Sequence, residues 1–132
     1  MSGMTNLDEL LRSISPEIIE GNYVFCTLNG TLSEFVALEP IASFREKEGL
    51  TLVLEEHTAI AANINFDAVF GLITLSVHSS LEAVGLTAAF ANKLSAHGIS
   101  ANVIAGYYHD HIFVQKSQVQ KAMNALNELS SS

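Results

Sequence analysis

Several scarce residue types narrow the class of this protein. Its 132 residues include a single cysteine, Cys26, two prolines and no tryptophan. One cysteine excludes an internal disulfide and fits a reducing compartment, and the apolar residues around it indicate a buried structural thiol. No apolar run approaches the length of a membrane span, and the N-terminal residues lack a basic region with an apolar signal core. We therefore expect a cytoplasmic protein.

Basic residues are also scarce. Six Lys and Arg stand against 14 Asp and Glu, for a net charge of −8. A nucleic acid would be repelled by this charge and would find no basic stripe, so we expect neither nucleic-acid nor membrane partners. The apolar share is 48%, and a chain of this length buries roughly two-thirds of its unfolded surface. A well-formed core is therefore expected.

The most informative stretch begins at residue 70. Its pattern predicts a strand, a helix and two further strands, at residues 70–78, 80–97, 100–105 and 112–114. Ser79 and Glu82 have the spacing of a capping box at a helix start, and Gly98 suits the left-handed position that ends a helix. A strand, a crossover helix and a returning strand form a right-handed unit. This unit places the helix start at the same sheet edge as the turn that carries Asp110.

A last helix follows in the C-terminal part. Ser117 and Gln120 form a second capping box, and the apolar residues after it repeat at helical spacing: Val119, Ala122, Met123, Leu126 and Leu129. The order β-α-β-β-α is one strand short of a ferredoxin-like βαββαβ module. We expect the N-terminal half to donate the missing strand, with residues 23–28 as the donor.

The N-terminal half has weaker signals. We predict helices at residues 6–14 and 55–62, a strand at 23–28, a brief strand at 35–38, and a hairpin that turns through 46–49. Residues 41–46 suit either a helical turn or a strand. The junction is expected within residues 63–67, which gives two halves, 1–66 and 67–132, the second lacking its own last strand.

Four segments together resemble the ACT-domain family, the amino-acid-sensing modules of aspartate kinase and related regulators. They are residues 40–54, 77–86, 96–100 and 105–114. The similarity is closer to small stand-alone bacterial ACT-like proteins with two such halves, and more distant to eukaryotic cytosolic arginine sensors. The resemblance implies an α+β, ferredoxin-like fold with ACT-type modules in tandem, antiparallel sheets and helices on one face. It also implies a ligand contact for Asp110 and Tyr107.

The chemistry of an amino-acid site can be stated from the residues themselves. A carboxylate favours the N–H groups and the dipole at a helix start, where Ser79 and Ser80 would add hydroxyl donors. Glycine at position 85 would let the backbone approach a ligand, and an ammonium group would favour Asp110. The candidate ligand-binding residues are Ser79, Ser80, Val84, Gly85, Leu86, Tyr107 and Asp110.

Each of these residues also has a structural interpretation. In this alternative, Gly85 serves helix–sheet packing only, and Asp110 only shapes a turn. Tyr107 and Tyr108 alternate on an extended chain, which predicts one in the core and one exposed. His109 and His111 share a face, but a zinc site needs three or four ligands, so surface histidines are the preferred interpretation and no metal or cofactor is expected.

The sequence contains no nucleophile motif, phosphate loop or pair of catalytic carboxylates. Two candidate functions remain. The first is a regulatory protein that binds an amino acid without catalysis. The second is an assembly module that binds no ligand and associates with itself or with a partner protein. For either one we expect a homodimer or a higher oligomer, because short apolar strands leave edges that need covering.

Overall fold

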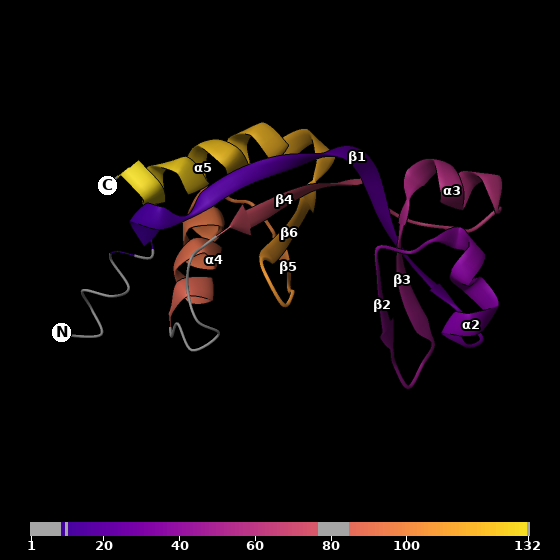
Figure 1. The fold of residues 1–132 in the computed structure, drawn as a ribbon. Helices are drawn as coiled ribbons and strands as arrows, with labels where there is room; N and C mark the ends of the chain where they lie inside the picture. Colours follow the sequence, from indigo (N-terminus) through magenta and orange to yellow (C-terminus); the bar gives the residue numbers. More distant parts are fainter. Residues whose placement is uncertain (1–8, 10, 77–84, 132) are drawn as a thin grey trace. The chain divides into compact units, whose positions relative to one another are not determined.

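The computed structural model describes residue 9 and residues 11–76 and 85–131. Its strands form a six-stranded sheet in the order β2-β3-β1-β4-β6-β5 (Figure 1). The chain separates into two compact units, residues 1–20 with 71–132 and residues 21–70. The long strand β1 (Ser15–Leu28) contributes to both units. The chain contains both helices and antiparallel strands, and the predicted α+β class is confirmed.

The first unit follows the element order predicted from residue 70. It contains β4 (Phe70–Ser76), α4 (Leu86–Ala96), β5 (Asn102–Ala105), β6 (Asp110–Gln115), the 3₁₀ turn η2 (Lys116–Gln118) and α5 (Val119–Ser131). Strands β5 and β6 pair antiparallel, with Ala105 opposite Asp110. The strand–helix–strand–strand–helix prediction is therefore confirmed. The predicted helix start at Ser79 and Glu82 lies outside the described residues.

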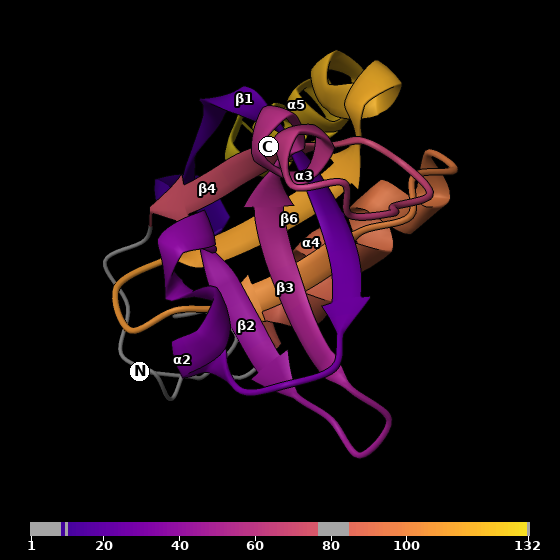
Figure 2. The ribbon, with the colours of Figure 1, turned by 90° about the vertical axis from the view of Figure 1, so that its right-hand side faces the viewer.

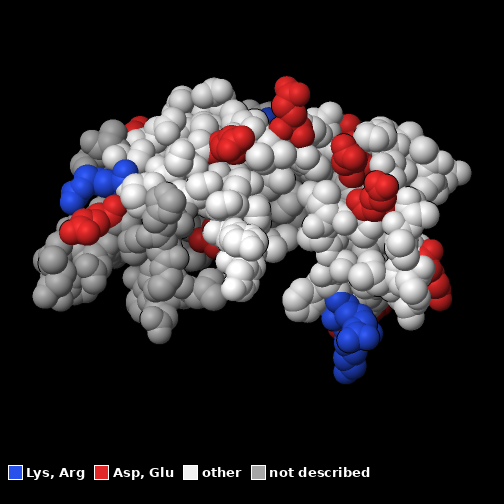
Figure 3. Space-filling model, in the orientation of Figure 1, with Lys and Arg blue, Asp and Glu red and all other residues white. Residues whose placement is uncertain are grey.

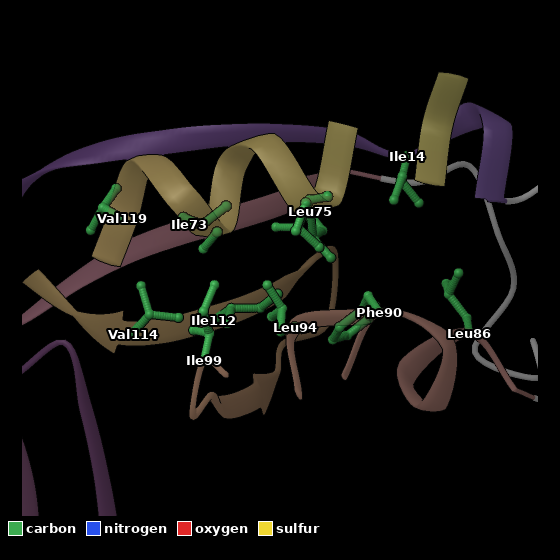
Figure 4. Close-up of a cluster of buried hydrophobic side chains, with 13 residues drawn as sticks. Ile14, Ile73, Leu75, Leu86, Phe90, Leu94, Ile99, Ile112, Val114 and Val119 are labelled. Atoms are coloured by element: carbon green, nitrogen blue, oxygen red, sulfur yellow. The ribbon is translucent and has the colours of Figure 1, made fainter. Parts of the chain in front are cut away.

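The core of this unit lies between the sheet and helices α4 and α5 (Figure 4). Alternate residues of two strands point to it, Ile73 and Leu75 from β4 and Ile112 and Val114 from β6. The helices contribute Phe90, Leu94, Ala122 and Leu126. Because side chains alternate across a strand, both helices cover the same face of this sheet. The apolar stripe predicted for the last helix is confirmed, with Met123 and Leu129 partly buried beside it.

The strand beside β4 is β1, which comes from the N-terminal half, as predicted. Residues 23–28, the predicted donor segment, pair on one side with β3 (Leu50–Glu55), from Tyr23 opposite Glu55 to Leu28 opposite Leu50, and their pairing with β4 stays a prediction. The first 20 residues are the ones that belong to the compact unit of β4. The division into residues 1–66 and 67–132 stays a prediction.

The second unit contains the other end of β1 with β2 (Ala42–Arg45), β3 and α3 (Glu56–Ala61) (Figure 2). The predicted hairpin and the predicted helix at residues 55–62 are confirmed. The Glu46 N–H donates to the Gly49 carbonyl at 2.9 Å, which closes the hairpin between β2 and β3. The ambiguous residues 41–46 are therefore mainly a strand. The buried core of this unit consists of Val24, Cys26, Leu50, Leu52, Leu54 and Ala59.

The strand predicted at residues 35–38 is wrong. The chain forms α2 (Leu32–Phe35) and the 3₁₀ turn η1 (Val36–Leu38) there. Phe35 and Leu38, three residues apart, both pack against the core of the second unit. This is helical spacing, and a run of four apolar residues is too short to distinguish it from a strand. Of the helix predicted at residues 6–14, residues 9 and 11–13 are described as helical.

Helix α4 ends as its sequence predicts. Gly98 has a φ of +74°, the Gly98 N–H donates to the Ser95 carbonyl, and the Ile99 N–H donates to the Leu94 carbonyl at 3.0 Å. This pair of bonds is a Schellman motif. Leu94 and Ile99 are both buried in the core, so the helix end and the start of the next segment pack together.

Candidate functional site

A polar contact between β4 and β6 shows which ends of these two strands lie side by side. Thr74, near the end of β4, is within 3.0 Å of Nδ1 of His111, near the start of β6. The two strands are neighbours in the sheet. The end of β4, which leads toward α4, therefore lies beside the start of β6, where Asp110 is located. The sequence predicted this shared edge but did not identify the contact.

The turn between β5 and β6 is short and internally bonded. The Gly106 N–H donates to the His109 carbonyl at 2.8 Å. A Cβ added to Gly106 would lie 3.0 Å from Nε2 of His111, so the imidazole ring rests against this backbone. Asp110 follows as the first residue of β6 and is half-buried. The Asp110 carboxylate therefore directly follows a turn that is closed by a hydrogen bond.

The two tyrosines of this turn differ from the prediction. Tyr107 is 81% exposed and Tyr108 is 79% exposed, so neither belongs to the core. Their rings contact each other edge to face, with centroids 5.0 Å apart. Alternation of sides holds for a strand, but residues 107 and 108 lie in the bend of a turn, where both side chains can point to solvent.

The start of α4 offers hydrogen-bond donors. Gly85 is its N-cap with a φ of +89°, a conformation that favours glycine, and it has no side chain that could accept a bond from the first turn. The Ala89 N–H donates to the Gly85 carbonyl at 2.9 Å, and the N–H groups before it have no partner within a helix. Leu86 is 5% exposed and its side chain belongs to the core. Any ligand contact of Leu86 would therefore involve its backbone.

Three of the predicted ligand residues, Ser79, Ser80 and Val84, lie outside the described residues. Of the others, Tyr107 and Asp110 are brought together on one turn, and Gly85 and Leu86 on one helix start. Sequence reasoning missed Thr74. The available signal was a threonine in the middle of the apolar run at residues 70–78, where a buried hydroxyl requires a partner.

His111 has an unusual environment for a histidine near a turn. Burial lowers the pKa of His111 below its ordinary value, the nearby His109 lowers it further, and Asp110 partly offsets both effects. The rings of His109 and His111 are 6.4 Å apart. Within residues 11–76 and 85–131 no cluster of three or more His, Cys, Asp or Glu is placed to hold a metal ion.

Cys26 is buried, as predicted, and its thiol donates to the Leu52 carbonyl at 3.5 Å. Burial raises the pKa of the thiol, and the bond to Leu52 lowers it by less. A raised pKa keeps the sulfur protonated and unreactive at neutral pH. Cys26 is therefore a core residue of the second unit.

Two family models, each described as an ACT domain, match residues 2–71 and residues 68–128. This chain belongs to the ACT-domain family. The two matches follow one another along the chain, so the protein contains two ACT domains in tandem, and its fold is ferredoxin-like. No curated protein matches the chain.

Solved structures extend the comparison. A Vibrio cholerae protein of unknown function, a possible transport protein, is 63% identical, with a TM-score of 0.92 over 98% of this chain and 99% of that one. The regulatory subunit of aspartate kinase from Thermus thermophilus is 6% identical, with a TM-score of 0.60 over 89% and 98%. Escherichia coli aspartokinase III is 12% identical, with a TM-score of 0.62 over 93% of this ACT protein and 34% of the kinase. At such identities the kinases share the fold alone.

A last observation concerns membranes. None of the helices in the described part of this ACT protein is both long enough and apolar enough to span a bilayer.

Proposed function

We propose that this protein is a cytoplasmic regulatory ACT protein that binds a free amino acid and catalyses no reaction. The ligand carboxylate would bind the N–H groups around Ser80–Gly85, the residues that precede α4 in the sequence. The ammonium group would bind the Asp110 carboxylate, with Tyr107 as one wall. Ser79, Ser80, Val84 and Leu86 complete the proposed contacts, and no cofactor or metal is required.

The contact between Thr74 and His111 is the observation that carries this proposal. It supports a site that draws on both the α4 start and the β5–β6 turn, because the strand leading to the helix ends beside the strand that begins with Asp110. Membership of a family of regulatory amino-acid-binding modules adds to this support. The ligand carboxylate would then meet hydrogen-bond donors, and the ligand ammonium group would meet a carboxylate.

The expected affinity follows from the number of charged contacts. A hydrogen bond to a charged group contributes about 1.5–3 kcal/mol, and the helix dipole contributes about 0.3–1 kcal/mol. Association costs oppose these gains. Before these costs the two charged contacts and the dipole contribute at most about 7 kcal/mol, so we expect an affinity no tighter than the micromolar range.

A thermal-shift screen against the common amino acids tests the proposal. A ligand at a hundred times its Kd stabilises the folded state by about 2.7 kcal/mol, which raises the melting temperature by several degrees. One amino acid, or a few related ones, should produce this shift. If none of them changes the melting temperature at millimolar concentration, the sensor function is wrong.

The variant Asp110→Asn tests the site itself. It keeps the shape of the side chain and removes the charge, so affinity should fall more than tenfold, because a buried charged contact contributes strongly to binding. The melting temperature of the ligand-free protein should change little. Calorimetric titration measures the affinity. Intact affinity with a destabilised free protein would mean that Asp110 only shapes the turn.

Assembly without a ligand is the second candidate, and one observation favours it. Strand β2 lies at one end of the sheet order, and its Phe44 is 70% exposed. An edge strand has unpaired backbone N–H and C=O groups that favour pairing with another chain, so we propose a homodimer or higher oligomer. Light scattering should give more than the monomer mass of 14.2 kDa at high micromolar concentration. A monomer mass would contradict the proposed self-association.

A further inference from the structure

The β5–β6 turn presents aromatic rings that the proposed amino-acid site does not use fully. Tyr107 and Tyr108 are 81% and 79% exposed, and the row continues with the His109 ring, 6.3 Å from that of Tyr108. A free amino acid is too small to cover both tyrosine rings. Exposed aromatic residues in a contiguous group commonly mark a contact surface for a macromolecule.

The backbone of the turn that carries these rings is held in place by hydrogen bonds. The Gly106 N–H bond to the His109 carbonyl closes the turn, and Ala105 pairs with Asp110 at its base. The His111 ring rests on Gly106 while its Nδ1 meets the hydroxyl of Thr74, a residue only 9% exposed. A partner therefore binds rings whose backbone needs little further ordering, which lowers the entropic cost of association.

Charge indicates the chemistry of the partner. No Lys or Arg occurs between Lys93 and Lys116, and the turn itself contains one charged residue, Asp110. Figure 3 shows both acidic and basic side chains on one face, and over the whole sequence the acidic residues outnumber the basic ones, for a net charge of −8. Tyrosine faces attract cations, arginine above all, and a carboxylate beside them accepts hydrogen bonds from guanidinium or ammonium groups.

We propose that the β5–β6 turn is a docking site for a protein partner that presents arginine or lysine side chains. Tyr107 and Tyr108 stack on the cationic groups, and Asp110 pairs with one of them. The phosphates of a nucleic acid are repelled by the acidic surface. A second copy of this chain is also a poor occupant, because it has only six basic residues against 14 acidic ones.

A hexa-arginine peptide without aromatic residues is the probe, titrated into the full chain in physiological salt with no amino acid present. The protein has no tryptophan and its third tyrosine, Tyr23, is buried, so tyrosine fluorescence reports on the turn. We expect the peptide to change this fluorescence saturably, and hexa-glutamate to leave it unchanged. Calorimetry gives the affinity for the variants that follow.

Three variants distinguish binding to the tyrosine rings from attraction to the net charge of the protein. The double variant Tyr107→Ser with Tyr108→Ser should bind the peptide at least tenfold more weakly, whereas Tyr107→Phe with Tyr108→Phe should retain most of the affinity because the ring faces remain. Ile60→Ser removes an apolar side chain that is 61% exposed on α3 and should have no effect. All three should melt near the wild-type temperature.

Several results would overturn the proposal. Equal affinity of the serine double variant would show that the peptide senses only the net charge. Absence of binding at millimolar peptide would exclude a cation-binding turn. A mass in light scattering that falls when the tyrosines become serine would make the turn an interface between copies. None of these results depends on whether an amino acid binds, so the proposal and the sensor function can fail separately.

Discussion

Some residues of the candidate site could be identified from their neighbours in the sequence, and others could not. Thr74 and His111 are 37 positions apart, and their contact fixes which strand ends meet. Gly98 could be assigned from the sequence because a helix end has a local signature. The partner of Thr74 could not be assigned in this way. A buried hydroxyl needs a hydrogen-bond partner, but the sequence does not indicate which residue supplies it.

His111 makes the stability of the folded protein depend on pH. Its pKa in the folded state is lowered, chiefly by burial, so the unfolded chain binds this proton more readily. The contribution of His111 is therefore complete above the ordinary histidine pKa of about 6.5 and is lost as the pH falls through that value toward the folded pKa. The free energy of unfolding in urea should decrease from pH 7.5 to pH 5.

The variant His111→Gln should reduce this pH-dependent decrease, because an amide does not titrate. His57→Gln, at an exposed position on α3, is the matched control. If both variants lose stability with pH as the wild type does, groups other than His111 govern the acid sensitivity.

At the scale of elements, packing between neighbours decided what local patterns left ambiguous. Residues 35–38 could be a strand or a helix by their apolar character, and the packing of Phe35 and Leu38 on one core selected the helix. Residues 41–46 were undecided until β3 supplied a partner, with Ala42 opposite Val53 and Arg45 opposite Leu50. Short segments depend on the surface they bury and not on their own propensity.

The contact between β4 and the start of α5 leaves no space for a side chain at Gly71. A Cβ there would lie 2.3 Å from Cγ2 of Val119, which is buried in the core. Gly71→Ala should therefore destabilise the protein by about 1–3 kcal/mol through overpacking. Urea denaturation of the two proteins measures this difference.

A double variant tests the cause. Adding Val119→Ala removes the methyl groups that the new Cβ would meet, so the double variant should be more stable than the sum of the single effects by about 0.5–3 kcal/mol. Strict additivity of the two changes would mean that Gly71 is required for its backbone alone.

At the scale of the whole molecule, the first unit is assembled from both ends of the chain. Residues 71–132 lack a strand that residues 1–20 supply. A fragment of residues 67–132 should therefore show no cooperative thermal transition as a soluble monomer, because one edge of its sheet and part of its core are exposed. Circular dichroism with temperature measures this.

A rearranged chain provides the control. Ile14 lies in the same buried cluster as Leu126 of α5, so a flexible linker from the end of α5 to residue 9 can restore the order in one polypeptide. This chain, residues 67–132 followed by 9–20, should regain a cooperative transition. Cooperative melting of residues 67–132 by themselves would contradict the requirement for the added strand.

The sequence by itself determined the order of the elements from residue 70 onward and the family. Periodicity, capping residues and Gly98 are local signals, and they act before any distant contact forms. Only the tertiary structure decided that both Tyr107 and Tyr108 are exposed, that Thr74 meets His111, and that the first part of β1 belongs to the compact unit of β4. These features depend on residues far apart in the chain, and local propensity carries no information about which distant surface a segment will bury.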